Sequence, residues 1–249
     1  MSEETKPPAE RASGPLAEGM LLGDAPEAAE QLGASRPPRI RVLGQGAGQF
    51  EVLGRVFDTF YCVLVSVKDI RRYYESKSDK MPVCFSNDLL APDPSSEDPQ
   101  SKTCRGCARA KFKRARDVEV GESRAPDCSR RFAVVLLPIK EKEDGFGAAI
   151  PCLLGVSPTN RAALSDYCTN LTLDNKGFTT VVTKVSAKSA KSGDYDVTAL
   201  EFEMARAATP EEHEAAQAYR KMAVDFAPTE DDVEEPSETE EAGSEIPID

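Results

Sequence analysis

The chain has 249 residues, of which 40% are hydrophobic, and a net charge of −12 that is unevenly distributed. Residues 1–35 carry −5 and residues 225–249 carry −11, which leaves residues 36–224 at +4. This length allows one well-filled domain or two small ones. Because the body between the acidic flanks is mildly basic, the low pI does not exclude nucleic acid as a partner.

Several classes of protein are excluded by the sequence pattern. No run approaches the roughly 18 consecutive apolar residues that a membrane-spanning helix needs, and the start, MSEETKPPAER, lacks the pattern of a secretory signal. We therefore expect a cytoplasmic protein whose seven cysteines are thiols or metal ligands rather than disulfides. A single histidine, His213, excludes a multi-histidine centre within one chain.

The first elements in chain order are a disordered segment and then strands. Residues 1–39 are rich in Pro, Ala and Glu and are predicted to be disordered. Residues 40–67 contain β-branched and aromatic runs that predict one or two strands. The apolar run at 131–139 predicts a strand covered on both faces.

A helix is predicted next, with Ser157 as N-cap and Pro158 at its first position. Its apolar residues recur at helical spacing on one face: Leu164, Tyr167, Cys168 and Leu171. Two further strands are predicted at 178–187 and 195–204, the second with a bulge near Ala199 because its alternation changes phase there.

The last predicted helix spans residues 209–226. Thr209 is its expected cap, Pro210 its first residue, and Glu212 completes a capping box. His213 lies off the apolar stripe and is expected to be exposed, without a role. Residues 227–249 are predicted to form a disordered acidic tail.

The order of strand, strand, polar insertion, strand, helix, strand and strand is that of the OB-fold. We therefore predict a mainly β structure with flanking helices (α+β), an OB-fold-like five-stranded barrel over residues 40–208. The insertion spans residues 82–130. Other α+β domains share this order, so function has to be argued from sites.

Four cysteines in the insertion have the spacing C-x19-C-x2-C-x20-C: Cys84, Cys104, Cys107 and Cys128. A Cys-x2-Cys knuckle lets two thiolates approach one ion, and two distant cysteines complete the tetrahedron that Zn²⁺ prefers. Four sulfur ligands close the coordination shell, so we predict one structural Zn²⁺ per chain. Free thiols and a thioredoxin-like pair are the alternatives; Cys62, Cys152 and Cys168 fit buried core positions.

Positive charge also concentrates in the insertion, beside aromatic residues. Cations that follow a phosphate backbone and rings that stack on bases are typical of single-strand binding. The candidate nucleic-acid contacts are Lys102, Arg105, Arg109, Lys111, Phe112, Lys113, Arg114 and Arg116, with a second cluster at Arg71, Arg72, Tyr73 and Tyr74. The alternative is a solvated face with core aromatics.

Other signals are weak. Gly44–Gly48 completes neither a dinucleotide-binding nor a P-loop fingerprint and is read as a flexible loop. No catalytic constellation is recognised, so we expect no enzyme. We expect the acidic tail to compete with nucleic acid for the basic surface or to recruit replication or recombination proteins; the alternative is a solvated, disordered end without a role.

Four stretches of the chain carry a resemblance to a known family: PVCFSNDLLAPDP, PQSKTCRGCARAKF, CSRRFAVVLLPI and PCLLGVSPTN. Over approximately residues 50–205 the chain resembles phage-encoded, zinc-containing OB-fold single-stranded DNA-binding proteins, comparable in plan to the T4-type protein. The resemblance implies zinc on the same four cysteines and a place in the cytoplasm of a bacterial host. It departs after the knuckle, where relatives commonly have a proline and Trp-Gly-Ser. Here Ala108 leads to Phe112, which either stacks on a base or packs beside the metal.

The sequence therefore predicts a protein that binds single-stranded DNA through basic and aromatic side chains, with a structural zinc site, and the resemblance implies a role in phage DNA replication or recombination. Two alternatives remain open. One is a zinc-ribbon transcription factor or polymerase adaptor, and the other is an acidic-tailed replication or recombination scaffold whose body touches no DNA.

Overall fold

The computed structural model describes residues 37–44, 46–76, 81–114, 125–141, 145–148, 150–192 and 195–222. Most of the predicted N-terminal disordered segment (1–39) and all of the predicted acidic tail (227–249) lie outside the described residues.

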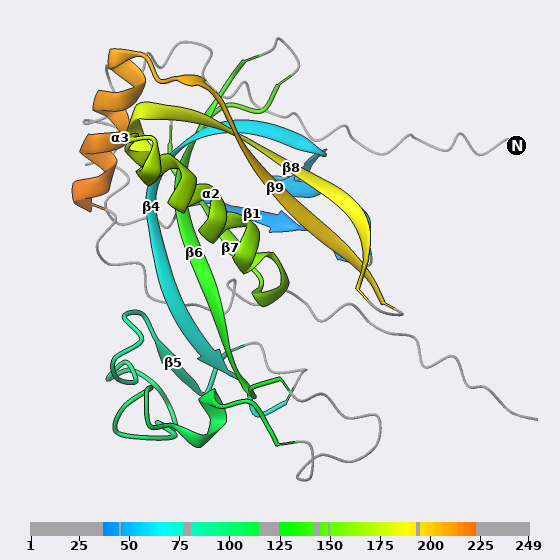
Figure 1. The fold of residues 1–249 in the computed structure, drawn as a ribbon, viewed down its shortest axis with the longest axis vertical. Coiled ribbons are helices and arrows are strands. Elements are labelled where there is room, and N and C mark those ends of the chain that lie inside the picture. Colours follow the sequence, from blue (N-terminus) through cyan, green and yellow to red (C-terminus); the bar gives the residue numbers. More distant parts are fainter. Residues whose placement is uncertain are drawn as a thin grey trace, which may run out of the picture.

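The described residues form a mainly β structure in which one strongly curled sheet, a half-barrel, is flanked by two helices (Figure 1). The strands are ordered β3-β2-β1-β7-β6-β4-β8-β9, with β5 paired to β4, and only β1 and β7 pair in parallel. The strands are β1 Arg39–Val42, β2 Phe50–Val52, β3 Arg55–Phe57, β4 Thr59–Tyr73, β5 Cys84–Ser86, β6 Cys128–Ile139, β7 Cys152–Val156, β8 Val181–Ser192 and β9 Tyr195–Ala207. The helices are α2 Arg161–Leu173 and α3 Pro210–Met222.

The mainly β class with flanking helices is confirmed, but the sheet has nine strands where five were expected. The segment predicted as one or two strands forms β1, β2, β3 and the first part of β4. The first three strands are only three or four residues long, and the turn between β2 and β3 uses positive φ at Leu53 and Gly54. Strands this short carry too little periodicity to be separated by pattern alone.

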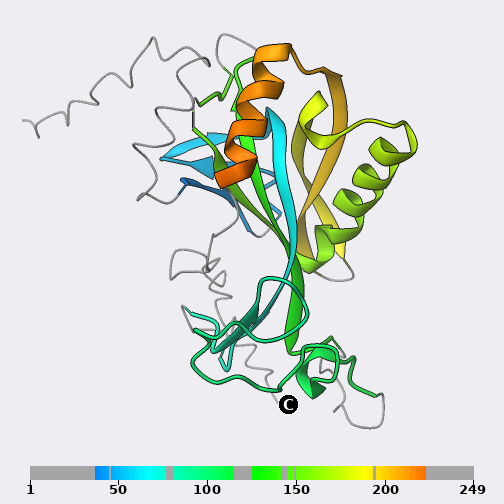
Figure 2. The same cartoon turned by 90° about the vertical axis from the view of Figure 1, so that its left-hand side faces the viewer.

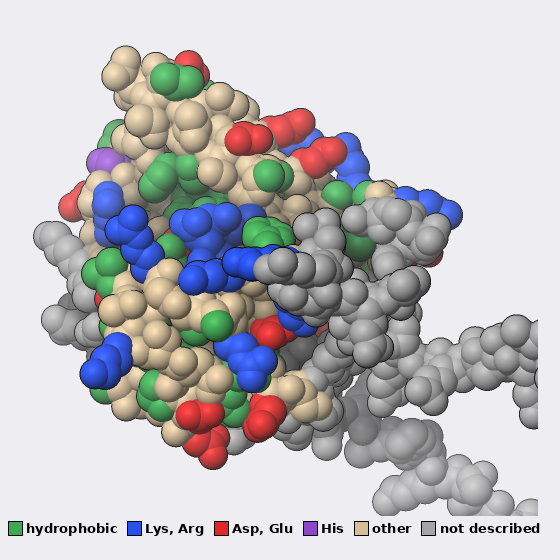
Figure 3. Space-filling view, turned by 60° about the horizontal axis from the view of Figure 1, so that its bottom comes forward, with side chains coloured by type: hydrophobic (Ala, Val, Ile, Leu, Met, Phe, Trp, Pro, Cys, Tyr) green, Lys and Arg blue, Asp and Glu red, His purple; other side chains and the backbone are tan. Residues whose placement is uncertain are grey.

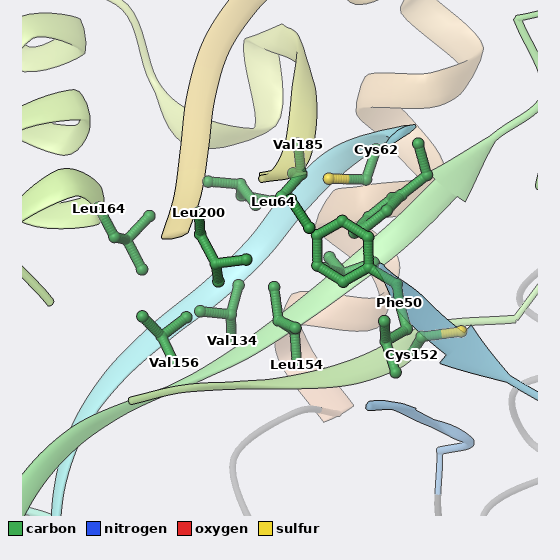
Figure 4. Packing of buried hydrophobic residues seen from close by; sticks show 14 of the residues in the cluster. Phe50, Cys62, Leu64, Val134, Cys152, Leu154, Val156, Leu164, Val185 and Leu200 are labelled. Carbon is green, nitrogen blue, oxygen red and sulfur yellow. The ribbon is translucent and has the colours of Figure 1, made fainter. Parts of the chain in front are cut away.

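A hydrophobic core fills the inner side of the curled sheet (Figure 4). Phe50 and Leu64 meet Val134 and Leu154 there, and α2 covers the cluster with Leu164. A second cluster on the opposite side of β4 and β6 joins Val63, Leu137 and the α3 residues Ala216 and Tyr219. The two helices therefore cover opposite sides of the central strands, as Figure 2 shows from the side.

The two long strands β4 and β6 extend beyond the curled body as a two-stranded ribbon. β7 pairs with β6 from Leu136 only as far as Phe132, and β8 pairs with β4 only from Thr59 to Cys62. Beyond these pairs, β4 and β6 stay together down to the pair of Tyr73 and Cys128, where β5 joins them. The predicted insertion therefore lies at the far end of this ribbon (Figures 1 and 2).

Both predicted helices are present, but only the second has the predicted cap. The helical segment begins at Pro158, as predicted, with a 3₁₀ turn over Pro158–Asn160 that leads into α2. The Ser157 side chain makes no capping bond, so that part of the prediction is wrong. At α3 the capping box is confirmed: the N–H of Glu212 donates to Thr209 Oγ1 at 3.3 Å, and the N–H of Thr209 donates to Glu212 Oε2 at 2.8 Å.

Two details of the C-terminal half correct the sequence prediction. No bulge lies at Ala199, because Thr198 takes the buried position before Leu200 and the alternation continues without a change of phase. The register shift of this pair falls instead between Val182 and Thr183. His213 is half-buried rather than exposed, and its Nδ1–H donates to the carbonyl of Thr179 at 2.9 Å.

The edge strand β9 is tied to the other end of the sheet by side chains. Asn160 is buried, and its Nδ2–H donates to the carbonyl of Thr198 at 2.9 Å while its Oδ1 accepts from the N–H of Leu200 at 2.9 Å. Thr198 Oγ1 donates to the carbonyl of Leu43 at 2.7 Å and accepts from the N–H of Gly48. A Cβ on Gly48 would lie 2.8 Å from the Ser189 nitrogen, so glycine is needed for this close approach.

We predict that Asn160→Ala lowers the free energy of unfolding by about 2–3 kcal/mol, because two buried backbone groups lose their partner. Urea denaturation measures this loss. The neighbouring exposed Thr159→Ala is the control and should change stability by less than about 0.5 kcal/mol. Equal losses in the two variants would contradict this role for Asn160.

Candidate metal centre and nucleic-acid interface

Two of the four insertion cysteines flank one residue of β4. Tyr73 pairs with Cys84 of β5 on one side and with Cys128 of β6 on the other. Side chains directly opposite each other on neighbouring strands share a face of the sheet. Both thiols therefore lie on the same face as the Tyr73 ring.

A hydrogen-bonded loop carries the chain from β5 to the knuckle. The Ser86 hydroxyl donates to Asp88 Oδ1 at 3.0 Å, and the same oxygen accepts from the N–H of Leu90 at 2.8 Å. The Leu90 carbonyl in turn accepts from the N–H of Cys104 at 2.9 Å. Ser86 and Asp88, which follow Cys84 in the stretch PVCFSNDLLAPDP, thus have a structural use, because their side chains hold the loop that delivers Cys104.

The Cys-x2-Cys knuckle is a tight turn. The N–H of Cys107 donates to the carbonyl of Cys104 at 3.4 Å, and a 3₁₀ turn over Ala108–Ala110 follows. This turn places both cysteines at the end of the ribbon, opposite the strands that carry Cys84 and Cys128.

All four cysteines line one small cavity of about 10 Å³, close to the minimum that can hold one water molecule, and each is 7% exposed. Arg71 and Arg109 also line the cavity. The cysteines nevertheless do not form a ready-made cluster: within the described ranges, no three His, Cys, Asp or Glu side chains are arranged as a metal-ion site. The structure therefore shows four thiols around one cavity, not a completed coordination shell.

The electrostatics of these thiols reflect burial and mutual proximity. Burial raises the pKa of Cys84, which the N–H of Gln100 lowers and the neighbouring Cys104 and Cys107 raise further. Burial also raises the pKa of Cys128 to about 11, although Arg71 lowers it by its charge and a hydrogen bond. Without a metal these two thiols are protonated at neutral pH, and a metal ion would have to displace their protons.

The other three cysteines are core residues. Cys62 and Cys152 are fully buried in the core cluster, as predicted, whereas Cys168 is half-buried at its edge. Burial raises the pKa of all three thiols.

The residues predicted to contact nucleic acid differ in how exposed their side chains are. Arg72 and Tyr73 are each 7% exposed and are therefore buried rather than available to a nucleic acid. Arg71, Tyr74 and Lys113 are half-buried, and Arg116 lies outside the described residues. The exposed candidates are Lys102, Arg105, Arg109, Lys111, Phe112 and Arg114.

The burial of Tyr73 has a clear cause. Its ring packs beside Cys84 and Cys128, and the Arg109 guanidinium lies 5.0 Å from its centroid. Arg109 and Lys113 also form ion pairs with Asp127 at 3.2 and 2.9 Å. These two cations lower the pKa of Asp127, Lys113 by the larger amount. Part of the predicted basic cluster thus also holds the insertion together.

Phe112 is the most exposed large hydrophobic residue among those described, at 77%. It lies between Lys111 and Lys113, so an unburied ring stands between cations. Figure 3, viewed from the insertion end, shows Lys and Arg side chains gathered in a band with hydrophobic side chains among them.

A second group of charged residues lies on the ribbon and was not predicted from the sequence. Arg130 Nε donates to Asp69 Oδ1 at 2.9 Å, and Arg161 donates to Asp69 Oδ2 at 2.8 Å. The Arg130-Arg131 pair beside Cys128 was a visible signal. Nothing in the sequence indicated that Arg161, 92 residues from Asp69, would join it.

No protein-family model, curated protein or solved structure matches the chain. Neither helix in the described ranges combines the length and the apolar composition that crossing a membrane requires.

We predict that the protein loses stability as the pH rises above about 9, because burial raises the pKa of Cys152 to about 12 and that of Cys168 to about 11. The folded protein keeps protons there that the unfolded chain has released, so this stability is complete below the ordinary thiol pKa and is lost above it. Urea midpoints at about pH 8 and about pH 10.5 measure the loss. Cys152→Ala should lose less than the unsubstituted protein over that interval; an equal loss would contradict the assignment.

Proposed function

We propose that this protein binds single-stranded DNA without strong sequence preference, through an insertion held by one structural Zn²⁺, and that it is not an enzyme. One observation carries the proposal: the exposed basic and aromatic segment from Lys102 to Arg114 is built around the cavity that the four cysteines share. A metal in that cavity would hold the segment in place.

The donor set supports zinc. The residues that would hold the ion are Cys84, Cys104, Cys107 and Cys128, which come from β5, the knuckle and the start of β6. Four thiolates suit Zn²⁺ and leave no open position for a catalytic water. When bound, the ion supplies folding free energy to a segment that has little core of its own.

The surface supports a single nucleic-acid strand as the partner. Lys102, Arg105, Lys111 and Arg114 are exposed near an unburied Phe112 ring, so phosphates and bases both have partners of suitable chemistry. Base stacking tolerates any sequence, and phosphate contacts make binding salt-dependent.

We further propose that the curled sheet is an incomplete OB-like barrel. The strands β4, β6 and β7, then α2, then β8 and β9 follow the expected order, and β4 pairs with both β6 and β8. Closing the barrel would need β7 beside β9. Here β7 pairs instead with the added strand β1, and Asn160 links α2 to β9 across the remaining gap.

The biological setting belongs to the same proposal: phage DNA replication or recombination in the cytoplasm of a bacterial host. The eleven acidic residues between 225 and 249, with no base among them, suit competition for the basic surface or contact with replication and recombination proteins.

The proposal is tested by titrating the purified protein, with its zinc content quantified, against fluorescent single-stranded and duplex oligonucleotides at two salt concentrations. We expect about one zinc per chain and single-strand-preferring binding that weakens steeply with salt. Duplex preference would favour the transcription factor. Zinc without DNA binding, even after removal of residues 225–249, would favour the scaffold.

We further predict that Cys104→Ser removes the zinc, makes the segment 82–127 sensitive to protease and weakens single-strand binding by roughly tenfold or more, since outer contacts of a metal site alone can cost 10- to 100-fold. Zinc content, limited proteolysis and fluorescence anisotropy measure the three effects. Cys168→Ser, outside the insertion, is the matched control and should keep zinc and affinity. A Cys104→Ser protein that retained both would contradict the zinc proposal.

A further inference from the structure

The ribbon between the curled body and the insertion presents a continuous face of its own. Along β4 and β6 the pairs Val67–Val134, Asp69–Phe132, Arg71–Arg130 and Tyr73–Cys128 alternate onto one side. Val67 and Phe132 pack against the core cluster, so this side continues the inner face of the sheet. It begins at the core and ends at the cysteine cavity.

The upper part of this face carries two arginines on one carboxylate. Arg130 bonds Asp69 through Nε, with a second close contact between its terminal nitrogen and the other carboxylate oxygen. Arg161, at the start of α2, reaches the same oxygen while its guanidinium lies 4.7 Å from the centroid of Phe132. Two guanidinium groups around one carboxylate leave a local excess of one positive charge.

The lower part of the face connects to the cysteine cavity. Arg71 lies beside Arg130 in the pairing register and forms no ion pair with any carboxylate in the described ranges; its guanidinium donates to the Cys128 carbonyl at 3.5 Å. Arg109 follows over the Tyr73 ring. The arginines from Arg161 to Arg109 are thus spread over about four residues of strand, or about 13 Å.

The side chains in this row remain accessible. The exposed fractions are 27% for Arg161, 43% for Arg130 and 48% for Arg109, whereas Asp69 is 21% exposed. The carboxylate is therefore the less accessible member of its cluster, and the cations form the outer layer.

The geometry points to this arginine row, Arg161, Arg130, Arg71 and Arg109, as a contact for the phosphate backbone of single-stranded DNA. This inference rests on the proposed function and extends its surface from the insertion to the ribbon and the start of α2. Guanidinium groups bind phosphate oxygens through paired hydrogen bonds, and Asp69 holds two of them in position before DNA arrives.

A single strand suits this row better than a duplex. The row runs along the ribbon from Arg161 to Arg109, with Arg130 and Arg71 side by side between them, and it suits one phosphate backbone, whereas a duplex presents two. The line leads toward the exposed Phe112 and its neighbouring lysines, where bases could stack.

The test compares Arg130→Gln with Lys188→Gln in binding to a fluorescent oligo(dT) over a series of NaCl concentrations. Lys188 pairs with Glu201 on the β8–β9 hairpin, so its variant loses the same charge elsewhere. For Arg130→Gln we expect weaker binding and a salt slope that is shallower by about 0.7, the value for one lost contact to a single strand. Arg130→Lys should retain the slope, and so should Lys188→Gln.

An unchanged slope in Arg130→Gln, or an equal change in Lys188→Gln, would overturn the inference while leaving single-strand binding intact. Absence of binding by the unsubstituted protein would instead overturn the proposed function and this inference with it. Weaker binding to duplex than to oligo(dT) is expected; the reverse would overturn the choice of a single strand.

A second measurement does not depend on how the variants fold. Phenylglyoxal modifies accessible arginines of the unsubstituted protein, and mass spectrometry locates the modified residues with and without oligo(dT). We expect protection of Arg130 and Arg109 but not of the exposed Arg220 on α3. Equal modification of Arg130 in both samples would overturn the inference.

Discussion

The pairing of β4 with β6 is the interaction on which the rest of the structure depends. It runs from Tyr61 opposite Ile139 to Tyr73 opposite Cys128, with one register shift between Leu64 and Ser66, and the register from Ser66 to Tyr73 links the core to the insertion. A shift by one residue would turn every side chain on the ribbon to the opposite face. Val67 and Val134 lie opposite each other at the core and anchor this register at one end, and it in turn places Arg71, Arg130 and Tyr73 at the other.

The same register explains how charges are used on this surface. Asp69 and Asp127 each hold two cations, so neither acidic residue neutralises its surroundings completely. A carboxylate shared in this way orders long side chains that would otherwise lose rotamer freedom when they bind a ligand. The acids within the basic region thus support the arrangement of the cations.

How far the sequence predicted these features depended on the range of the interactions. Features that depend on neighbouring residues were predicted correctly. The spacing of Leu164, Tyr167 and Leu171 predicted the buried face of α2, and Thr209 with Glu212 predicted the capping box of α3. Long-range pairing could not be foreseen. Tyr73 looked like an exposed aromatic beside arginines, but pairing with both β5 and β6 buries it. The parallel contact of β1 with β7 and the approach of Arg161 to Asp69 likewise join residues far apart in the chain.

The insertion is the part of the described structure that most needs a stabilising interaction besides its own hydrophobic core. Among the described residues its apolar cluster holds Tyr73, Cys84 and Cys128, with Val83 and Ala110 partly buried beside them. This is little apolar area against the entropy of ordering a long polar segment. A Zn²⁺ ion bound by four thiolates would carry a net charge of −2, and Arg71 and Arg109 line the cavity where that charge would reside. These two arginines would then be shared between the metal site and a phosphate backbone. Arg130 and Arg161, both anchored by Asp69 and outside the lining of the cavity, are the members of the row whose charge is independent of the metal.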